Sequence, residues 1–414
     1  MKPLHRKRLA QAVAAATAFG GAAMLHAAFE EITGSDNPFS TVTSGGNKPS
    51  IVMMDLDNDG DLDLVMFHQQ TEDDFPFTDS YTSVWENTGS ATAAVFTQLQ
   101  DAPGYGYAGD SLSSNPFANS YTNFYGHPVT AAELDDGREI FIAGTSSTCC
   151  NALLNYAFIN RDGEDVVTGL TQTNSNTGTT GYGASETPFY GFSLPAYGAY
   201  GSSVAAGDLY NNGRPDLLIN DSTSGLRLFE NTGKSFYGQY SFSEVTSGPF
   251  PISLDGAYYG APIVLHDIDD DGDLDLIVGT ATAGNMRLFL NKGSAATPDF
   301  EEVTDEAEEL GLDIASRGWA APTFADVTGD GVAELIVLER FQNTSELLSA
   351  GGDSAPRISS TEQEVRLFAF TAAEEEEEES ETTTETKKKK GKLFGGLGTG
   401  LLASFGLLWL RRRR

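Results

Sequence analysis

The chain has 414 residues and a formal net charge of −34 at pH 7, and many of its 25 basic residues lie near the two ends. Such an acidic body repels nucleic acid and anionic membrane surfaces and attracts cations, which excludes nucleic acid as a partner. Hydrophobic residues make up 40% of the chain, enough to bury a core in one large domain or in several average ones.

Residues 1–28 have the pattern of a secretory signal peptide. A basic start (Lys2 and residues 6–8) precedes an Ala-rich apolar run, and the small residues Ala27 and Ala28 lie just before the acidic Glu30. The mature chain is therefore expected to begin near Phe29. An N-terminal membrane anchor is the alternative, and both interpretations predict that the body of the protein is exported.

The body repeats one pattern of strands five times. Each repeat opens with a strand, an acidic turn and a second strand, as in PSIVMMDLDNDGDLDLVMF from Pro49. A third strand ends with an aromatic residue, as in LRLFENTG from Leu226, and a fourth begins with Phe, as in FEEVT from Phe300. Four antiparallel strands per repeat predict an all-β fold, a five-bladed β-propeller. The blades are expected near residues 49–99, 127–170, 202–246, 261–304 and 321–370.

The fifth repeat lacks a fourth strand, because an acidic low-complexity run follows Phe370. The segment FEEIT at residues 29–33 nearly matches the fourth strand FEEVT of the preceding repeat. We therefore expect it to pair with the last blade and close the ring, which removes the open sheet edges that promote aggregation. The propeller is predicted to occupy residues 29–373.

These repeats resemble the FG-GAP and VCBS repeats of integrin α-chain propellers and of many secreted bacterial proteins. The segment YYGAPIVLHDIDDDGDLDLIVG from Tyr258 is the best copy, and the resemblance covers most of residues 29–373. The integrin propeller has seven blades, so the predicted count of five departs from it. The partner sites of integrins are therefore not transferred to this chain.

Two of the acidic turns have the spacing of a calcium loop. Acidic residues occupy loop positions 1, 3, 5 and 9, with Gly at position 6 for the sharp turn, and the Asp at position 7 is expected to donate its backbone carbonyl. Blade one supplies Asp55, Asp57, Asp59, Asp61 and Asp63, and blade four supplies Asp267, Asp269, Asp271, Asp273 and Asp275.

Oxygen ligands in this number suit Ca²⁺, whereas zinc prefers His or Cys. The loops are not EF-hands, because Met66 and Val278 stand where an EF-hand has its last Glu. An Asp/Asn/Gly turn that is merely solvated is the alternative. The ion is expected to stabilise the fold rather than to perform chemistry.

The other three turns depart from this pattern. Blade five offers a full oxygen set of lower charge, made of Asp326, Thr328, Asp330 and Glu334. Blade three has Asp208, Asn212 and Asp216, but Tyr210 replaces the ligand at the third position. Blade two has a broken spacing around Asp135 and Asp136, so a plain turn is expected there.

No nucleophile motif, phosphate loop or metal triad is found, and the chain is not expected to be an enzyme. Gly/Tyr/Phe-rich insertions from Gly104, Gly181 and Gly248 are expected on one rim, where they could hold an extracellular protein or carbohydrate ligand. Alternatively, these aromatic rings pack between the blades. A secreted carbohydrate-active enzyme and a purely structural surface protein are the other functional alternatives. The adjacent Cys149 and Cys150 form either a strained disulfide or two thiols.

The tail predicts attachment to a membrane. Residues 374–392 form a charged, disordered linker, residues 393–410 form an apolar stretch near the minimum length for a transmembrane helix, and residues 411–414 are four arginines that favour the cytoplasmic side. This ending also resembles GlyGly-CTERM sorting tails, with Gly395 and Gly396 before the apolar stretch, which would imply cleavage. We expect a calcium-binding protein exported to the cell surface, with its propeller outside.

Overall fold

The structure is a computed structural model of the whole chain. It describes residues 28–43, 47–69, 80–99, 115–117, 128–148, 151–174, 188–189, 192–195, 202–221, 225–235, 239–248, 250, 252–254, 258, 260–269, 271–282, 284–294, 297–303, 315–316, 318–342 and 361–371. The predicted signal peptide (except Ala28), charged linker, transmembrane helix and basic end, and both cysteines, lie outside these residues. Within the described part, no helix is long and apolar enough to cross a membrane.

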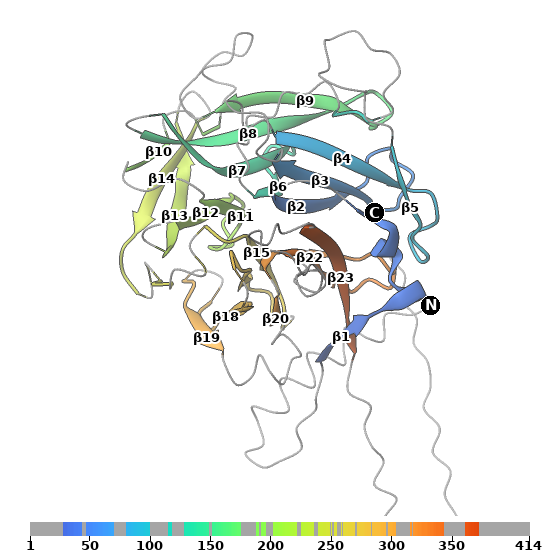
Figure 1. Cartoon of the computed structure of the whole chain (residues 1–414). Coiled ribbons are helices and arrows are strands. Elements are labelled where there is room, and N and C mark those ends of the chain that lie inside the picture. Colours follow the sequence, from blue (N-terminus) through green and yellow to red (C-terminus); the bar gives the residue numbers. More distant parts are fainter. Residues whose placement is uncertain are drawn as a thin grey trace, which may run out of the picture. The chain divides into compact units, whose positions relative to one another are not determined.

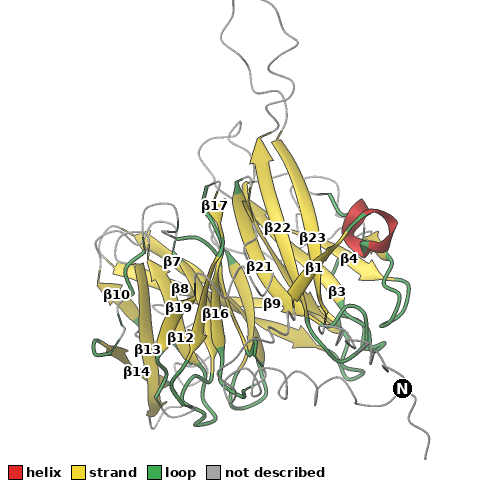
Figure 2. Cartoon of the chain, turned by 90° about the horizontal axis from the view of Figure 1, so that it is seen from below, coloured by secondary structure: helices red, strands yellow, loops and turns green. Residues whose placement is uncertain are grey.

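The described strands form five antiparallel sheets arranged as a propeller ring, which confirms the predicted fold (Figures 1 and 2). Blade one contains β2 (Asn47–Met54), β3 (Asp63–Gln69), β4 (Ser80–Asn87) and β5 (Phe96–Gln98). Blade two contains β6 (Val129–Glu133), β7 (Glu139–Thr148), β8 (Asn151–Arg161) and β9 (Val167–Asn174), and the short β10 (Ser193–Pro195) also pairs with β8.

The remaining blades have the same order of strands. Blade three contains β11 (Ser203–Gly207), β12 (Asp216–Asp221), β13 (Gly225–Lys234) and β14 (Tyr240–Val245). Blade four contains β15 (Ile263–His266), β16 (Asp275–Val278), β18 (Arg287–Asn291) and β19 (Phe300–Val303), and blade five contains β21 (Trp319–Ala325), β22 (Glu334–Gln342), β23 (Thr361–Thr371) and β1 (Ala28–Ile32). A separate two-stranded pair joins β17 (Gly284–Asn285), which lies between β16 and β18 along the chain, to β20 (Ala315–Ser316), which precedes blade five.

The second strand of each blade is apolar on both faces because each blade is covered by a neighbour on both sides. In β3, for example, Leu64 and Met66 belong to one apolar cluster, and Val65 and Phe67 belong to the next. Side chains of a strand alternate between its two faces, so a continuous apolar run is what such a strand requires. This explains why the second strands read as unbroken Leu, Ile and Val runs in the sequence.

The N-terminal strand closes the ring, as predicted. β1 pairs antiparallel with β23, with Glu30 opposite Ala369 and Ile32 opposite Leu367, and Figure 1 shows the two strands side by side. Arg366 of β23 forms two hydrogen bonds of 2.8 Å with the carboxylate of Glu31 in β1. Arg227–Glu244 and Arg287–Glu302 repeat this cross-strand pair in blades three and four. β1 therefore takes the place of an ordinary fourth strand.

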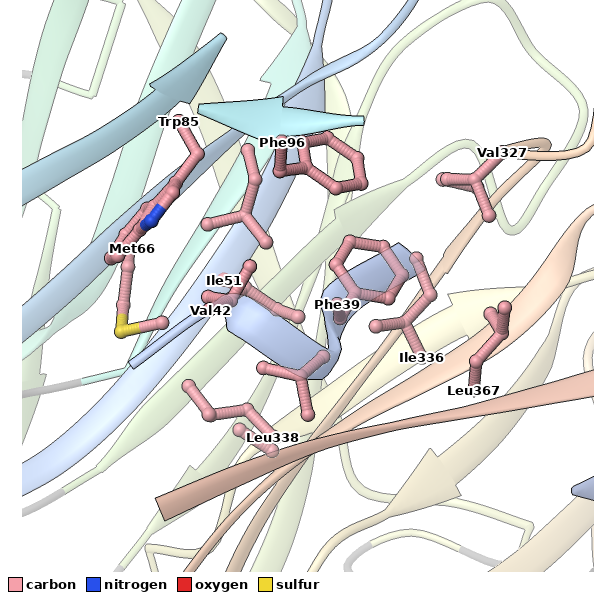
Figure 3. Close-up of a cluster of buried hydrophobic side chains, with 14 residues drawn as sticks. Phe39, Val42, Ile51, Met66, Trp85, Phe96, Val327, Ile336, Leu338 and Leu367 are labelled. Atoms are coloured by element: carbon pink, nitrogen blue, oxygen red, sulfur yellow. The ribbon is translucent and has the colours of Figure 1, made fainter. Parts of the chain in front are cut away.

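The core consists of five apolar clusters, one in each interface between neighbouring blades, which we call seams. Figure 3 shows the seam between blades five and one: Phe39 lies between Phe96 of blade one and Ile336 and Leu367 of blade five. The rings of Phe39 and Phe96 stack with their centroids 4.7 Å apart. A packed core at this seam is independent support for a closed ring.

A short segment with the sequence Pro-Phe precedes the first strand of four blades and packs into the seam before it. The Phe of each segment is at most 4% exposed: Phe39, Phe117, Phe189 and Phe250. Phe39 lies on the 3-10 helix η2 (Pro38–Thr41), which follows the 3-10 helix η1 (Gly34–Asp36). In two of these segments an Asn precedes the Pro. Its side-chain amide donates to a third-strand carbonyl of the preceding blade, from Asn37 to Val365 (3.0 Å) and from Asn115 to Thr82 (3.1 Å). These bonds cover third-strand backbone that the fourth strand does not reach.

Candidate metal centre

The loop between the first and second strands has the same internal frame in blades one, three, four and five. Its ninth residue begins the second strand and is an acid that is at most 3% exposed: Asp63, Asp216, Asp275 and Glu334. One oxygen of each accepts the backbone N–H of loop position 2, at 2.8–2.9 Å. In the first three of these blades the other oxygen accepts the N–H of an Asn in the third strand, at 2.7–2.8 Å. The ninth acid thus fixes both the loop and the strand beside it.

In blade one the structure brings together three of the five predicted ligands. Carboxylate oxygens of Asp55, Asp57 and Asp63 lie within 4.8 Å of one another. Asp55 also accepts the backbone N–H of Gly60 at 3.1 Å, and Gly60 has φ of 93°, the positive value that the sequence required. Asp59 lies outside the group of three and accepts the N–H of Asp61.

Asp61 was predicted to act through its backbone carbonyl, but its side chain is also a feature of the site. It is only 7% exposed, and its Oδ1 has no hydrogen-bond partner. A buried carboxylate oxygen without a partner carries a desolvation penalty that a bound cation or water would relieve. The sequence does not predict this burial. The residue at the same loop position in blade four, Asp273, is also an Asp but is only half-buried.

In blade four the three gathered acids are Asp267, Asp269 and Asp271, whose oxygens again lie within 4.8 Å. Asp267 accepts the N–H groups of Asp271 (3.1 Å) and Gly272 (3.0 Å), which holds the turn closed. The Oδ1 atom of Asp269 is buried without a partner. Asp275 lies outside the group of three, as the buried ninth acid described above.

In blade five the gathered acids are Asp326, Asp330 and Glu334. The hydroxyl of Thr328, the fourth predicted ligand, donates to Glu334 Oε1 at 2.7 Å, so it lies beside the group. Asp326 accepts the N–H of Gly331 at 2.8 Å, as its equivalents do in blades one and four. Three described loops therefore have acidic groups that could hold a metal ion.

The loops of blades two and three are neutralised or filled by the protein's own side chains. In blade two, Asp136 pairs with Arg138 at 2.9 Å, and Asp135 pairs with Lys234 of blade three at 2.5 Å. In blade three the side chain of Tyr210, which replaces the third ligand, packs against the seam with blade four. Neither loop gathers three acids as the other loops do.

Burial and mutual repulsion of the carboxylates raise several pKa values. Burial is the main cause of the raised pKa of Asp63 and Asp275, each about 7, with neighbouring Asp residues adding to it. Burial also raises the pKa of Asp269 to about 6, together with the charges of Asp271 and Asp267. The same two causes raise the pKa of Asp57 and of Glu334. The metal-free loops therefore favour protonation, which a divalent cation would reverse.

These shifts predict a pH dependence for the metal-free protein. The pKa of Asp63 and that of Asp275 are each about 7 in the folded protein, but about 3.9 in an unfolded chain. Between these values the folded state binds more protons, so its stability falls as pH rises from about 4 to about 7. Urea unfolding in EDTA across this range measures the slope. The Asp63→Asn variant should have a shallower slope, and an unchanged slope would contradict the assignment.

The donor sets of the three loops fit a calcium ion. All the gathered atoms are carboxylate oxygens, the ligands that Ca²⁺ prefers, and no His or Cys takes part in them. The partnerless oxygens of Asp61 and Asp269 are a second indication that these loops are built for a cation. The residues that would hold the ion are those gathered in each loop, with Thr328 beside them in blade five.

Comparison with known proteins agrees with this architecture. The family model described as FG-GAP-like repeat matches residues 208–278 and 267–337, which span the third, fourth and fifth loops. Residues 208–337 therefore contain FG-GAP-like repeats, and together with the five sheets they support an FG-GAP repeat propeller. No curated protein sequence matches the chain.

Among solved structures, the chain is similar to a lectin of Agrocybe aegerita whose specific recognition of non-reducing terminal N-acetylglucosamine has been described. The identity is 14%, the match covers 74% of this chain and 80% of the lectin chain, and the TM-score is 0.32. A similarity of this size carries no conclusion about what this chain binds.

The aromatic insertions are only partly described. Phe117, Phe189 and Phe250 belong to them and are buried in seams, as the packing alternative predicted. The rest of the predicted ligand rim lies outside the described residues. The first strands of all five blades line one small pocket whose surface is more polar than apolar, with Ser50, Thr130 and Thr323 as its hydroxyl groups.

Proposed function

We propose that this propeller binds calcium through the loops of blades one, four and five and acts outside the cell as a recognition or adhesion domain. The observation that carries the calcium proposal is the gathering of three carboxylates within 4.8 Å in each of these loops. Without a cation such groups repel one another, and this repulsion adds to burial in raising the pKa values of Asp269 and Asp57.

The extracellular location and the ligand belong to the same proposal. The signal-like residues 1–28 and the tail of residues 374–414 support export and attachment to the cell surface, and FG-GAP repeats support an extracellular role. The ligand would be an extracellular protein or a carbohydrate held by the Gly/Tyr/Phe-rich rim. Catalysis is not part of the proposal. Turnover of a glycan by the purified protein would favour the carbohydrate-active enzyme instead.

Calorimetric titration of the full chain with calcium, after removal of divalent ions, tests the first step. We expect up to three sites and weaker binding of magnesium, which requires a stricter geometry and keeps more of its water. The Asp269→Asn variant should lose one site.

The matched control for this titration is Glu301→Gln, which removes one negative charge from an exposed position on β19 of the same blade. It should bind calcium like the original chain. If both variants bind calcium like the original chain, Asp269 is not a ligand. If the titration of the original chain shows no heat of calcium binding, the calcium proposal fails.

A further inference from the structure

Each of the five first loops inserts an apolar residue into the seam with the next blade. This residue is at loop position 2, and its exposed fraction is between 2% and 7% in all five cases: Leu56, Leu134, Leu209, Ile268 and Val327. Each one belongs to the apolar cluster that its blade shares with the next blade around the ring. The conformation of the loop therefore decides how well the two blades pack together.

In the calcium-type loops of blades one and four the inserted residue lies between two acids, and in that of blade five it lies between Asp326 and Thr328. Leu56, for example, stands between Asp55 and Asp57, and its N–H donates to the ninth acid, Asp63, at 2.9 Å. A cation bound by these three acids would hold the backbone on both sides of the inserted residue. Cation binding and seam packing are thus joined at one residue.

Polar contacts also tie the blade-one loop to blade two. The amide of Asn58 donates to the carbonyl of Glu164 at 3.0 Å, and the N–H of Val167 donates to the carbonyl of Leu56 at 2.7 Å. Arg161 donates to the carbonyl of Asp55 at 3.1 Å. In the same way, the loop of blade five approaches blade one closely, since a Cβ on Gly329 would clash with the carbonyl oxygen of Ala91.

At two of the five seams the loop contains or contacts basic or aromatic side chains of the protein, whereas at the other three seams the loop has gathered acids. Between blades two and three, Asp135 accepts the Tyr240 hydroxyl at 2.6 Å and pairs with Lys234 at 2.5 Å. Between blades three and four, Tyr210 fills the third loop position and packs against the seam. Neither arrangement involves a divalent cation.

The three calcium-type loops are consecutive around the ring, in blades four, five and one. Their seams are those between blades four and five, five and one, and one and two. Blade five, whose fourth strand β1 comes from the other end of the domain, therefore has a cation-type loop at both of its seams. Its own loop gathers three acids with a hydroxyl at the third position, a lower charge than the loops of its neighbours.

We propose, on the basis of the calcium binding proposed above, that divalent cations act as a latch. Bound to the loops of blades four, five and one, they hold the three seams around blades five and one together. Withdrawal of the cation loosens the three seams around blades five and one, and β1 separates from β23 first. The seams between blades two, three and four stay packed, because Lys234, Tyr240 and Tyr210 do not depend on calcium. The protein then changes between a closed ring and a ring open at blade five.

Hydrogen exchange of the full chain, measured by mass spectrometry with calcium and then with EDTA, tests this proposal. In EDTA we expect the exchange rates of residues 28–33 and 365–371 to rise about tenfold or more, while those of β12 and β13 rise much less. An equal rise in all five blades, or a rise confined to the loops themselves, would overturn the latch. Calorimetry on the same sample shows whether calcium binds, so a failure of calcium binding is distinguished from a failure of the latch.

Two variants sharpen the result. Lys234→Gln removes the built-in cation of the seam between blades two and three, and exchange in β7 and β14 should rise both in calcium and in EDTA. A disulfide introduced between the paired positions Glu30 and Ala369 should suppress the effect of EDTA on β1, because the two strands can no longer separate. If EDTA still deprotects β1 in the cross-linked protein, opening at β1 and β23 is not the event that calcium controls.

Discussion

The Phe189→Ala variant is expected to lose about 3–5 kcal/mol of its free energy of unfolding, the usual result of truncating a large buried aromatic residue. Phe189 has no exposed surface, and its ring contacts Tyr156 (centroids 5.0 Å apart) and Tyr240 (5.6 Å). These rings come from blades two and three, so the truncation leaves a cavity in the seam between them. Urea unfolding followed by tryptophan fluorescence measures the loss.

Two controls make this result specific. Phe189→Leu keeps most of the apolar volume and should lose much less stability. Val95→Ala removes an apolar side chain that is 56% exposed and should change the stability by about 0.5 kcal/mol or less. If Phe189→Ala loses no more than Val95→Ala, Phe189 is not the packed residue that the seam requires.

Calcium is expected to stabilise the full chain by an amount comparable to the stability lost in the Phe189→Ala variant. At a calcium concentration one hundred times the dissociation constant, each site should add about 2.7 kcal/mol to the free energy of unfolding. The reason is that the unfolded chain does not hold the carboxylates together, so the ion binds the folded state selectively. Thermal unfolding in EDTA, then in calcium, then in magnesium, measures this gain.

The sites can be separated by substitution at the third loop position. Asp57→Ala and Asp269→Ala should each reduce the calcium-dependent rise in melting temperature, and the double variant should reduce it further. Glu301→Gln is again the control of equal charge change. A rise of the same size in the double variant would mean that calcium stabilises the protein elsewhere, and no rise in the original chain would mean that the acidic turns are only turns.

The fold could be predicted from the sequence because the five repeats can be aligned with one another. The hairpin pattern recurs five times, and the near identity of FEEIT and FEEVT gives β1 its place beside β23. Acidic groups in the loops of blades one, four and five could be predicted in the same way, since Asp spacing places alternate side chains on one side of the loop. Spacing alone does not predict which acids gather, because Asp63 and Asp275 accept the same two backbone N–H groups, yet only Asp63 belongs to a gathered group.

Other features left a signal in the sequence that the repeat alignment did not use. The apolar residue at loop position 2 is present in every blade, but it looks like part of a polar turn until the seam is known. Pro-Phe recurs before four blades, at Phe39, Phe117, Phe189 and Phe250, and the last three lie inside insertions that were interpreted as a ligand rim. Packing between blades is a non-local property, so neither role follows from local pattern alone.

The pairing of β1 with β23 also determines when the ring can form during folding. Arg366 and Glu31, which join these strands, are separated by 335 residues, whereas the strands within the other blades are close neighbours in sequence. Hairpins of the first four blades can form as soon as their residues are available, but blade five must wait for both ends of the domain. Ring closure is therefore a late and slow step, as expected for contacts of such long range. Until it occurs, β23 presents an unpaired edge, so the interval before closure is when the chain is most exposed to aggregation.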